Sequence, residues 1–365
     1  LTWERATTTD IGIDFTMFND RLLFSADYYW RKTKDMYTVG KTLPQVFGAD
    51  SPKGNYADMT TRGWELSITW ADRFNLGGKP FNYRLHGTLA DSYSVIDKYN
   101  NAEKNLSDYY VGERLGEIWG YVTEGLFKDQ ADINSSPSQL QLRSGQNNIW
   151  QPGDIKFKDL NGDKKITYGN NRAGDSGDRK VIGNALPRYT FSLNLSADWN
   201  NLYCSAFFQG VGKQNWYPSS ERIFWGQYNR PYNQYPKWHV GNEWTENNPD
   251  AYLPRNVGYS ALSRNAELQV AQTRYLQNVA YIRLKNLQIG YNLPKNIVGK
   301  AHMQRASVYI SAENIWCYSP LYKRTHDIDV TNISGSDPDL TTINYGDGLN
   351  YPQMKSISLG LSVTF

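Results

Sequence analysis

Oxygen-bearing side chains recur at alternate positions of one short acidic stretch, at Asp159, Asn161 and Asp163. Carboxylate and amide oxygens at this spacing suit Ca²⁺, and the backbone carbonyl of Lys165, two residues further on, would add another oxygen ligand. Asp178 follows a polar insert and could reach back to the same ion. The sequence therefore predicts a calcium-binding loop.

The loop is not an EF-hand. An EF-hand has glycine at the sixth position and a bidentate acid at the twelfth, where this chain has Lys164 and Asn170. A looser loop could recruit Asp175 or Asp178 instead. The alternative is an Asx-turn that staples a surface loop, with Lys164 and its neighbour supplying the positive charge.

A second stretch, residues 223–255, interleaves aromatic rings with Asn, Gln and Arg. Flat rings beside amide groups suit glycan recognition, because sugar C–H faces stack on aromatic surfaces. The alternative is that the rings pack the loop onto its own support or against a partner. We expect residues 244–255 to act as scaffold, and we expect ligand or partner contacts from Trp225, Tyr228, Tyr232, Tyr235 and Trp238.

Other kinds of chemistry have little support. The chain has no G-x-S-x-G, H-E-x-x-H, P-loop or dinucleotide-binding motif, and its four histidines show no ligand spacing. Cys204 and Cys317 suggest packing rather than a metal site. A formal charge of only +3 is too small for the excess of positive charge that nucleic-acid-binding proteins usually carry. We therefore expect neither an enzyme nor a nucleic-acid-binding protein, and no cofactor beyond the calcium ion.

The elements that carry these loops are read from strict alternation of apolar and polar residues. The last eleven residues, KSISLGLSVTF, alternate without error and end on Phe365. Period-2 alternation indicates strands whose two faces meet different media. We expect an all-β fold with strands at 5–18, 21–36, 57–71, 80–95, 187–199, 201–212, 276–292, 304–316 and 353–365.

Strand length and loop asymmetry favour a membrane barrel over a soluble β-sandwich. Soluble strands usually run about 5–6 residues, whereas these run about 12–16, enough for the roughly 9–11 residues that cross a bilayer. Short turns alternate with long loops at 37–56, 96–186, 213–275 and 317–352. The chain is rich in Tyr and Trp, with 27 and 12 residues, and these rings would form headgroup girdles. Seven polar residues would line the lumen: Asp14, Asp27, Arg31, Glu65, Arg84, His86 and Glu313.

Several stretches in sequence order resemble one family, the SusC/RagA-like TonB-dependent transporters of Bacteroidetes outer membranes. The opening stretch matches the family's paired-strand pattern through Leu1, Trp3, Glu4, Gly12, Asp14, Tyr28, Tyr29, Lys32, Thr33, Lys34 and Asp35. The match continues with GDIKFKDLNGDKKIT, DRKVIGNALPRYTFSLN, WTENNPDAYLPR, YIRLKNLQIGYNLP and VYISAENIWCYS.

The resemblance implies that residues 1–365 are the C-terminal portion of a transmembrane barrel of about 22 strands with long extracellular loops. The plug domain and the N-terminal strands would lie outside this chain, and the lumenal residues would face the plug. Phe365 would be the terminal aromatic that barrel-assembly machinery is thought to read.

The same resemblance implies active nutrient import across the outer membrane. A SusD-like surface lipoprotein would cap the mouth, and TonB–ExbB–ExbD would act on the plug. Oligosaccharide is the expected cargo and peptide the alternative. A passive porin and a soluble glycan-binding β protein are the competing classes.

Overall fold

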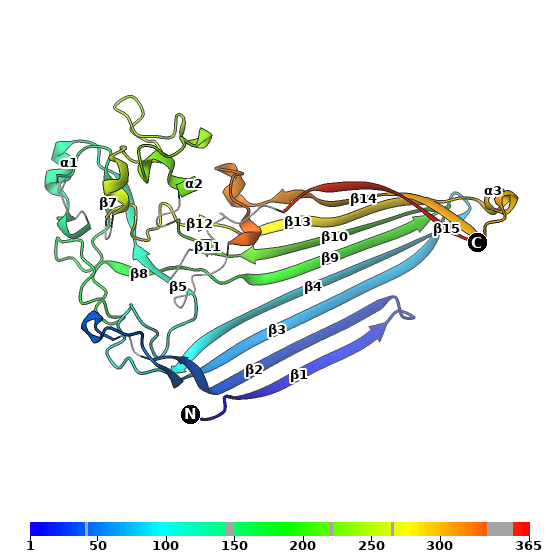
Figure 1. The fold of residues 1–365 in the computed structure, drawn as a ribbon, viewed down its shortest axis with the longest axis horizontal. Coiled ribbons are helices and arrows are strands. Elements are labelled where there is room, and N and C mark those ends of the chain that lie inside the picture. Colours follow the sequence, from blue (N-terminus) through cyan, green and yellow to red (C-terminus); the bar gives the residue numbers. More distant parts are fainter. Residues whose placement is uncertain (41–42, 143–148, 219–221, 264–265, 334–352) are drawn as a thin grey trace.

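The computed structural model describes residues 1–365 except 41–42, 143–148, 219–221, 264–265 and 334–352. Its dominant feature is one antiparallel nine-stranded sheet in which the strands follow one another in chain order (Figure 1). The strands are β1 (Arg5–Met17), β2 (Leu22–Val39), β3 (Lys53–Leu76), β4 (Lys79–Lys98), β9 (Arg188–Trp199), β10 (Leu202–Lys213), β13 (Tyr281–Asn292), β14 (Arg305–Tyr318) and β15 (Ser356–Thr364). All nine predicted strands are present.

Three strands differ clearly in their ends from the prediction. Strands β3 and β4 are 24 and 20 residues long, and their paired register runs well past the predicted ends. Strand β13 begins at Tyr281 rather than at residue 276, because Gln277–Asn278 forms a separate short strand, β12, that pairs with β11 (Asn215–Trp216).

The pairing register aligns side chains of similar polarity in rows that run across eight strands. One row is largely polar: Asp14, Ser25, Ser67, Thr88, Ser192, Gln209, Arg283 and Cys317. The next row, one residue along each strand, is apolar except for a glycine: Phe15, Phe24, Ile68, Gly87, Leu193, Phe208, Leu284 and Trp316. Because successive side chains point to opposite faces, these rows define a polar side and an apolar side of one sheet.

The apolar side is not covered by a second layer of the described protein. Ile310 and Leu359, which are register partners on this side, are 54% and 82% exposed. In a soluble sandwich such residues would be buried against a facing sheet. The exposed rows therefore match the lipid-facing wall of a transmembrane barrel, whose polar side lines the lumen. All seven predicted lumenal residues lie on the polar side of the register.

The two ends of the sheet differ in their connections. At one end the strands are joined by tight turns, and residues with positive φ make them: Gly77 and Gly78 in one, Asn200 and Asn201 in another. Paired positive φ values suit two-residue hairpins, because their twist matches that of the strands. The short helix α3 (Lys295–Val298) and the C-terminus also lie at this end (Figure 1).

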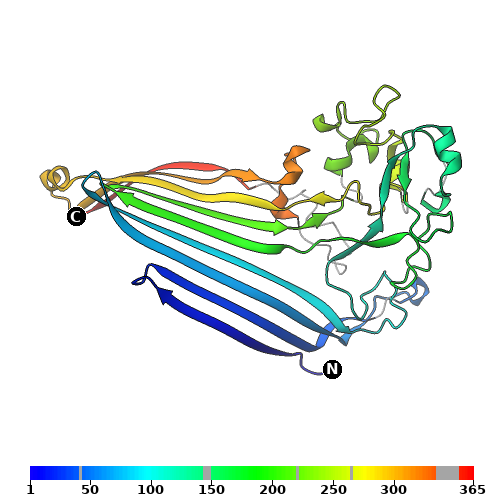
Figure 2. The ribbon, with the colours of Figure 1, turned by 180° about the vertical axis from the view of Figure 1, so that it is seen from behind.

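At the opposite end the long loops build a second layer of structure, seen from behind in Figure 2. We call the described residues of 99–187, 214–280 and 319–333 the loop head. It contains β5 (Glu117–Tyr121) paired with β8 (Arg179–Asn184), β6 (Thr123–Leu126) paired with β7 (Ile155–Phe157), α1 (Gln130–Ser135) and α2 (Arg222–Trp225). Its 3-10 turns are Leu140–Leu142, Gly226–Tyr228, Lys237–His239, Gly258–Leu262, Pro320–Lys323 and Val330–Asn332. Two further 3-10 turns, Gln45–Phe47 and Gly299–Ala301, lie outside the head.

The loop head has a hydrophobic core of its own. Buried side chains from all three long loops meet there, including Tyr121, Phe157, Phe224, Leu268 and Ile328. Burial of each such side chain is worth about 1.5–3 kcal/mol, so the head is a folded unit and not a set of separate loops. In the described part of the chain, no helix is long and apolar enough to cross a membrane.

Candidate functional site

Two of the five predicted contact rings belong to the core of the loop head. Trp225 and Tyr228 are completely buried. The indole of Trp225 donates to the carbonyl of Pro218, and the hydroxyl of Tyr228 donates to the carbonyl of Pro254 at 2.6 Å. A ligand cannot stack on a ring that protein atoms enclose. The prediction that these two rings contact cargo or a partner is therefore corrected: they pack the head.

The other three rings lie nearer the surface. Trp238 is partly buried and packs 5.0 Å from Phe224, measured between ring centroids. Tyr232 and Tyr235 are 81% and 43% exposed. Burial, together with a hydrogen bond to Glu243, raises the pKa of Tyr235 to about 12. Tyr232 and Tyr235 remain predicted contact residues, since their rings are open to solvent.

A buried histidine organises the segment that carries these rings. His239 is fully buried and its Nε2 lies 2.9 Å from the carbonyl oxygen of Phe224. Its Nδ1 is 3.9 Å from Oε1 of Glu243. Burial lowers the pKa of His239 to about 4, with a smaller opposing effect from the Phe224 carbonyl. The ring is therefore neutral at pH 7 and acts as a core residue.

The predicted calcium loop is closed by hydrogen bonds from its own backbone. The carboxylate of Asp159 accepts from the N–H groups of Gly162 at 2.6 Å and Lys164 at 2.9 Å. Asp163 accepts from the N–H of Lys165 at 2.7 Å. Lys164 has a φ of +62°, the left-handed conformation for which an EF-hand uses glycine at the same position. The backbone thus has the tight turn of a calcium loop without its glycine.

Asp178 joins this loop as the sequence predicts. It is fully buried, and its carboxylate accepts from the N–H groups of Leu160 at 2.8 Å and Thr167 at 2.7 Å. Burial raises the pKa of Asp178, two backbone hydrogen bonds oppose the shift, and the charges of Asp159 and Asp163 add to it. Among described residues, no group of three His, Cys, Asp or Glu side chains is placed to hold a metal ion. The calcium site stays a prediction, carried by mixed carboxylate, amide and carbonyl oxygens.

Two of the sequence motifs meet in space, which sequence reasoning missed. Asp154 is buried and forms a two-point ion pair with Arg255, at 3.2 Å from both Nε and Nη2. The ring of Trp244 lies over the neighbouring Gly153, whose φ is +85°. The two long loops are therefore joined at this point, which supports the predicted scaffold role of residues 244–255.

A second missed contact ties the loop head to the polar side of the sheet. Arg283 on β13 is buried, and its guanidinium donates to Asp329 at 2.6 Å. The acid lies in the loop that follows β14, and a hydrogen bond from the N–H of Thr331 also holds it. This loop therefore folds inward over the end of the polar side. The available sequence signal was a charged Arg283 inside an otherwise strand-like stretch.

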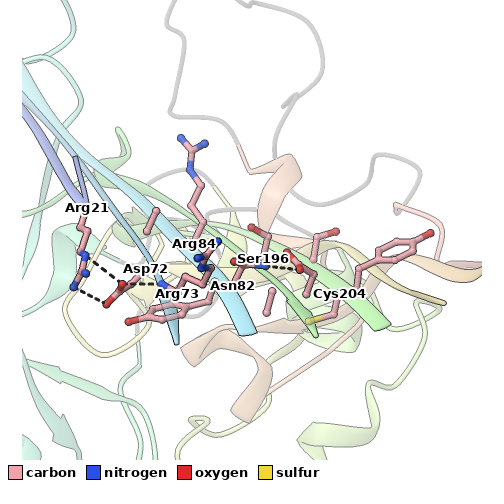
Figure 3. A pocket seen from close by; sticks show the side chains of 13 residues that line it. Arg21, Asp72, Arg73, Asn82, Arg84, Ser196 and Cys204 are labelled. Carbon is pink, nitrogen blue, oxygen red and sulfur yellow. Dashed lines mark hydrogen bonds and ion pairs between the residues drawn. The ribbon is translucent and has the colours of Figure 1, made fainter. Parts of the chain in front are cut away.

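A shallow pocket of about 790 Å³ opens near the tight turns, at the end opposite the loop head (Figure 3). Arg21 contacts Asp72 in an ion pair of 3.3 Å, and the side-chain amide of Asn82 donates to Asp198 at 2.7 Å. Arg84, predicted to line the lumen, is among the lining residues. The pocket is charged and open, which suits contact with another polar surface more than enclosure of a small molecule.

The family profile described as TonB dependent receptor-like, beta-barrel matches residues 1–315. The chain belongs to the TonB-dependent receptor β-barrel family. TonB-dependent receptor P26 of Formosa agariphila is 27% identical over the whole chain, which covers 35% of that protein. TonB-dependent receptor SusC of Bacteroides thetaiotaomicron is 26% identical over the whole of this chain. The match covers 32% of the length of SusC. This TonB-dependent receptor chain thus spans about a third of the curated relatives it matches.

Solved structures agree on the fold. The RagAB peptide transporter superposes with a TM-score of 0.68 and 19% identity, covering all of this chain and 36% of that one. Another RagAB structure, the peptide importer in its open-open state, superposes with a TM-score of 0.68 and is 21% identical in sequence. The TonB-dependent receptor chain is therefore part of an integral β-barrel of the bacterial outer membrane.

Proposed function

We propose that this chain forms wall and mouth of a TonB-energised importer of the SusC/RagA type, with oligosaccharide as its cargo and a SusD-like lipoprotein over its mouth. The observation that carries the proposal is the folded loop head, anchored to the polar side of the wall through Arg283 and Asp329. A passive pore needs only loops that leave its mouth open. A head with its own core instead supplies a fixed surface that a lid can contact.

The polar side of the wall suits contact with a plug. Its side chains already pair across strands, as Thr88 does with Ser192 at 2.7 Å between hydroxyl oxygens and Thr69 with His86 at 2.8 Å. The charged pocket near the tight turns adds Arg73 and Arg84 for acidic or carbonyl partners. We infer that the plug rests on this side, and that TonB–ExbB–ExbD act through it.

The choice of oligosaccharide rests on the exposed rings of Tyr232 and Tyr235, next to Asn233. Exposed rings beside amide groups can stack on sugar faces and bond their hydroxyls. The test measures uptake of fluorescent oligosaccharides and oligopeptides by cells that carry the full-length protein as their only transporter of this class. We expect oligosaccharide uptake that a protonophore abolishes.

Paired variants locate the cargo contact. Replacing Tyr232 and Tyr235 by Ala should lower oligosaccharide uptake severalfold, whereas Tyr168→Ala, an exposed head tyrosine outside this segment, should leave it unchanged. Peptide uptake in place of sugar uptake would reassign the cargo. Uptake that persists with the protonophore would make the barrel a passive pore.

A further inference from the structure

A cluster of cationic and aromatic side chains lies on the apolar side of the wall, at the end that carries the loop head. Thr9, Trp30, Arg62 and Tyr93 are successive register partners across β1 to β4. Arg62 lies an even number of residues from Ile68 on β3, so its side chain projects from the same side of the sheet as that exposed apolar residue. Lys32 lies two residues beyond Trp30 on β2 and also projects from this side, toward the loop head. We call Trp30, Lys32, Arg62, Tyr93 and Arg114 the rim patch.

The positive charges of the rim patch are only partly balanced. Arg62 and Lys32 are exposed, and in the described part of the structure neither forms an ion pair. The backbone of Arg114 forms an isolated β-bridge with Val95, near the end of β4. The guanidinium carbon of Arg114 lies 4.4 Å from the centre of the Tyr93 ring. A cation over a ring keeps its full charge while gaining a weak attraction.

Two acids on this side of β4 have partners outside the rim patch. The carboxylate of Asp91 is engaged by Arg188, which contacts it through two nitrogen atoms. Asp97, on the same side of β4, accepts a hydrogen bond from the hydroxyl of Thr60 at 2.5 Å. In the described part of the structure, neither of these two carboxylates forms an ion pair with Lys32, Arg62 or Arg114, at the boundary where the apolar rows end.

Position decides what can meet these cations. Toward the tight turns, the rim patch is followed by the row Ile11, Tyr28, Trp64 and Asp91, and then by the apolar row Ile13, Ala26, Leu66 and Leu89. A lipid whose acyl chains lie along that row would bring its headgroup to Arg62 and Lys32. At the extracellular end of an outer-membrane barrel the headgroups are those of the outer leaflet, whose glycolipid carries phosphate on its sugars. A guanidinium binds such a phosphate through two parallel hydrogen bonds, and a lysine binds it as a point charge.

We propose that the rim patch is a binding site for the phosphorylated glycolipid of the outer leaflet, with Arg62 and Lys32 on its phosphates and Trp30 at the boundary between sugar and acyl chain. The site is independent of the cargo and of the plug. It would fix the depth of the wall in the membrane and surround the mouth with ordered lipid.

The test uses the full-length protein in detergent micelles and counts bound lipid by native mass spectrometry. The probe is bisphosphorylated lipid A, and its dephosphorylated form, phosphatidylglycerol and inorganic phosphate serve as comparisons. The double variant Lys32→Gln/Arg62→Gln should bind lipid A at least about tenfold more weakly, since it removes both cations that would contact the phosphates. The charge-conserving variant Lys32→Arg/Arg62→Lys should keep most of the affinity.

A matched control removes two cations that lie outside the rim patch, Arg31→Gln/Lys295→Gln, and should bind lipid A as the parent does. Arg31 adjoins Lys32 in the chain but points to the opposite side and bonds Thr8. Both single variants at the rim patch are measured in parallel, so that a double variant that fails to fold does not end the test. Equal lipid A affinity in rim and control variants overturns the proposal. So does a wild-type protein that prefers phosphatidylglycerol or the dephosphorylated lipid, or that loses lipid A to inorganic phosphate at equal concentration.

Discussion

Arg255 and Asp154 are 101 residues apart in the chain, yet the guanidinium of one lies flat against the carboxylate of the other with two contacts of 3.2 Å. The pair joins the loop that follows β4 to the loop that follows β10. The backbone adds a third contact, from the N–H of Arg255 to the carbonyl of Gly153 at 2.8 Å. The loop head therefore holds together through a junction between its two longest segments.

Removal of the arginine should loosen this junction. Arg255→Ala leaves a buried carboxylate without its guanidinium, which typically costs about 3 kcal/mol. Hydrogen exchange of residues 151–157 and 242–255 in the full-length protein should accelerate accordingly. The control is Arg172→Ala, which removes a largely exposed partner of Glu103 and should cost less than about 1 kcal/mol. Similar exchange in both variants would mean that the junction does not hold the head together.

The glycine in the same junction gives a steric prediction. A Cβ at Gly153 would collide with the ring of Trp244, and φ at this residue is +85°. We expect Gly153→Ala to destabilise the head by about 3 kcal/mol, combining backbone strain with overpacking. Gly162 is the matched control, because its φ is +81° but no atom lies within 4 Å of an added Cβ. Gly162→Ala should cost only about 1 kcal/mol. Limited proteolysis and hydrogen exchange would compare the stability of the head in the two variants. Equal destabilisation by Gly153→Ala and Gly162→Ala would show that the contact with the Trp244 ring is unimportant.

Stability of the loop head should depend on pH through Glu113. Burial raises the pKa of Glu113 to about 7, a hydrogen bond from the N–H of Tyr110 opposes the shift, and the charge of Glu117 adds to it. The folded state then binds the proton more tightly than the unfolded state, so stability is full below about pH 4.5 and falls as pH rises toward 7. Glu113→Gln should therefore stabilise the head at pH 8, by on the order of 1–3 kcal/mol, and change little at pH 4.

The measurement is hydrogen exchange of residues 94–118 at both pH values. Glu246→Gln, at an exposed position in the head, serves as control and should have no effect beyond about 0.5 kcal/mol. A stabilisation of Glu113→Gln that is equal at pH 4 and pH 8 would assign the effect to packing rather than to charge.

Calcium should relieve repulsion in the acidic loop. Asp159 and Asp163 both raise the pKa of the buried Asp178, so a divalent cation among their oxygens would remove an unfavourable interaction. We expect millimolar Ca²⁺ to slow hydrogen exchange of residues 159–178, and Mg²⁺ to do so much less, because Mg²⁺ demands stricter geometry. Chelation should reverse the effect. Exchange that does not respond to either ion would leave the loop as an Asx-turn motif.

The wall of this protein was predictable because its two sides meet different media. Lipid on one side and polar surroundings on the other require apolar and polar residues to alternate, as they do from Ile357 to Phe365. The strands can therefore be predicted from the local sequence alone. The ends of β3 and β4 could not be read in this way, because paired strands continue beyond the membrane where alternation is no longer required.

The loop head was less predictable, because its contacts join distant segments. Rings such as Trp225 have the same local sequence whether they face a ligand or a core, and only the enclosing residues Phe224 and Tyr275 decide it. Asp159 and Asp163 were placed correctly in one loop, since a turn of five residues is a local structure. The pairing of Asp154 with Arg255 depends on two loops that fold together, which no spacing in the chain encodes.

Polar and apolar rows alternate by a single residue across eight strands, and this constrains how such a protein can change in length over evolution. One residue gained or lost within β9 would turn every later side chain of that strand to the wrong side. Insertions and deletions should therefore accumulate in the loop head and be scarce within strands. Relatives would then share a wall of nearly constant dimensions while the loops of the head diverge in length and sequence. One barrel architecture could then accept different cargoes.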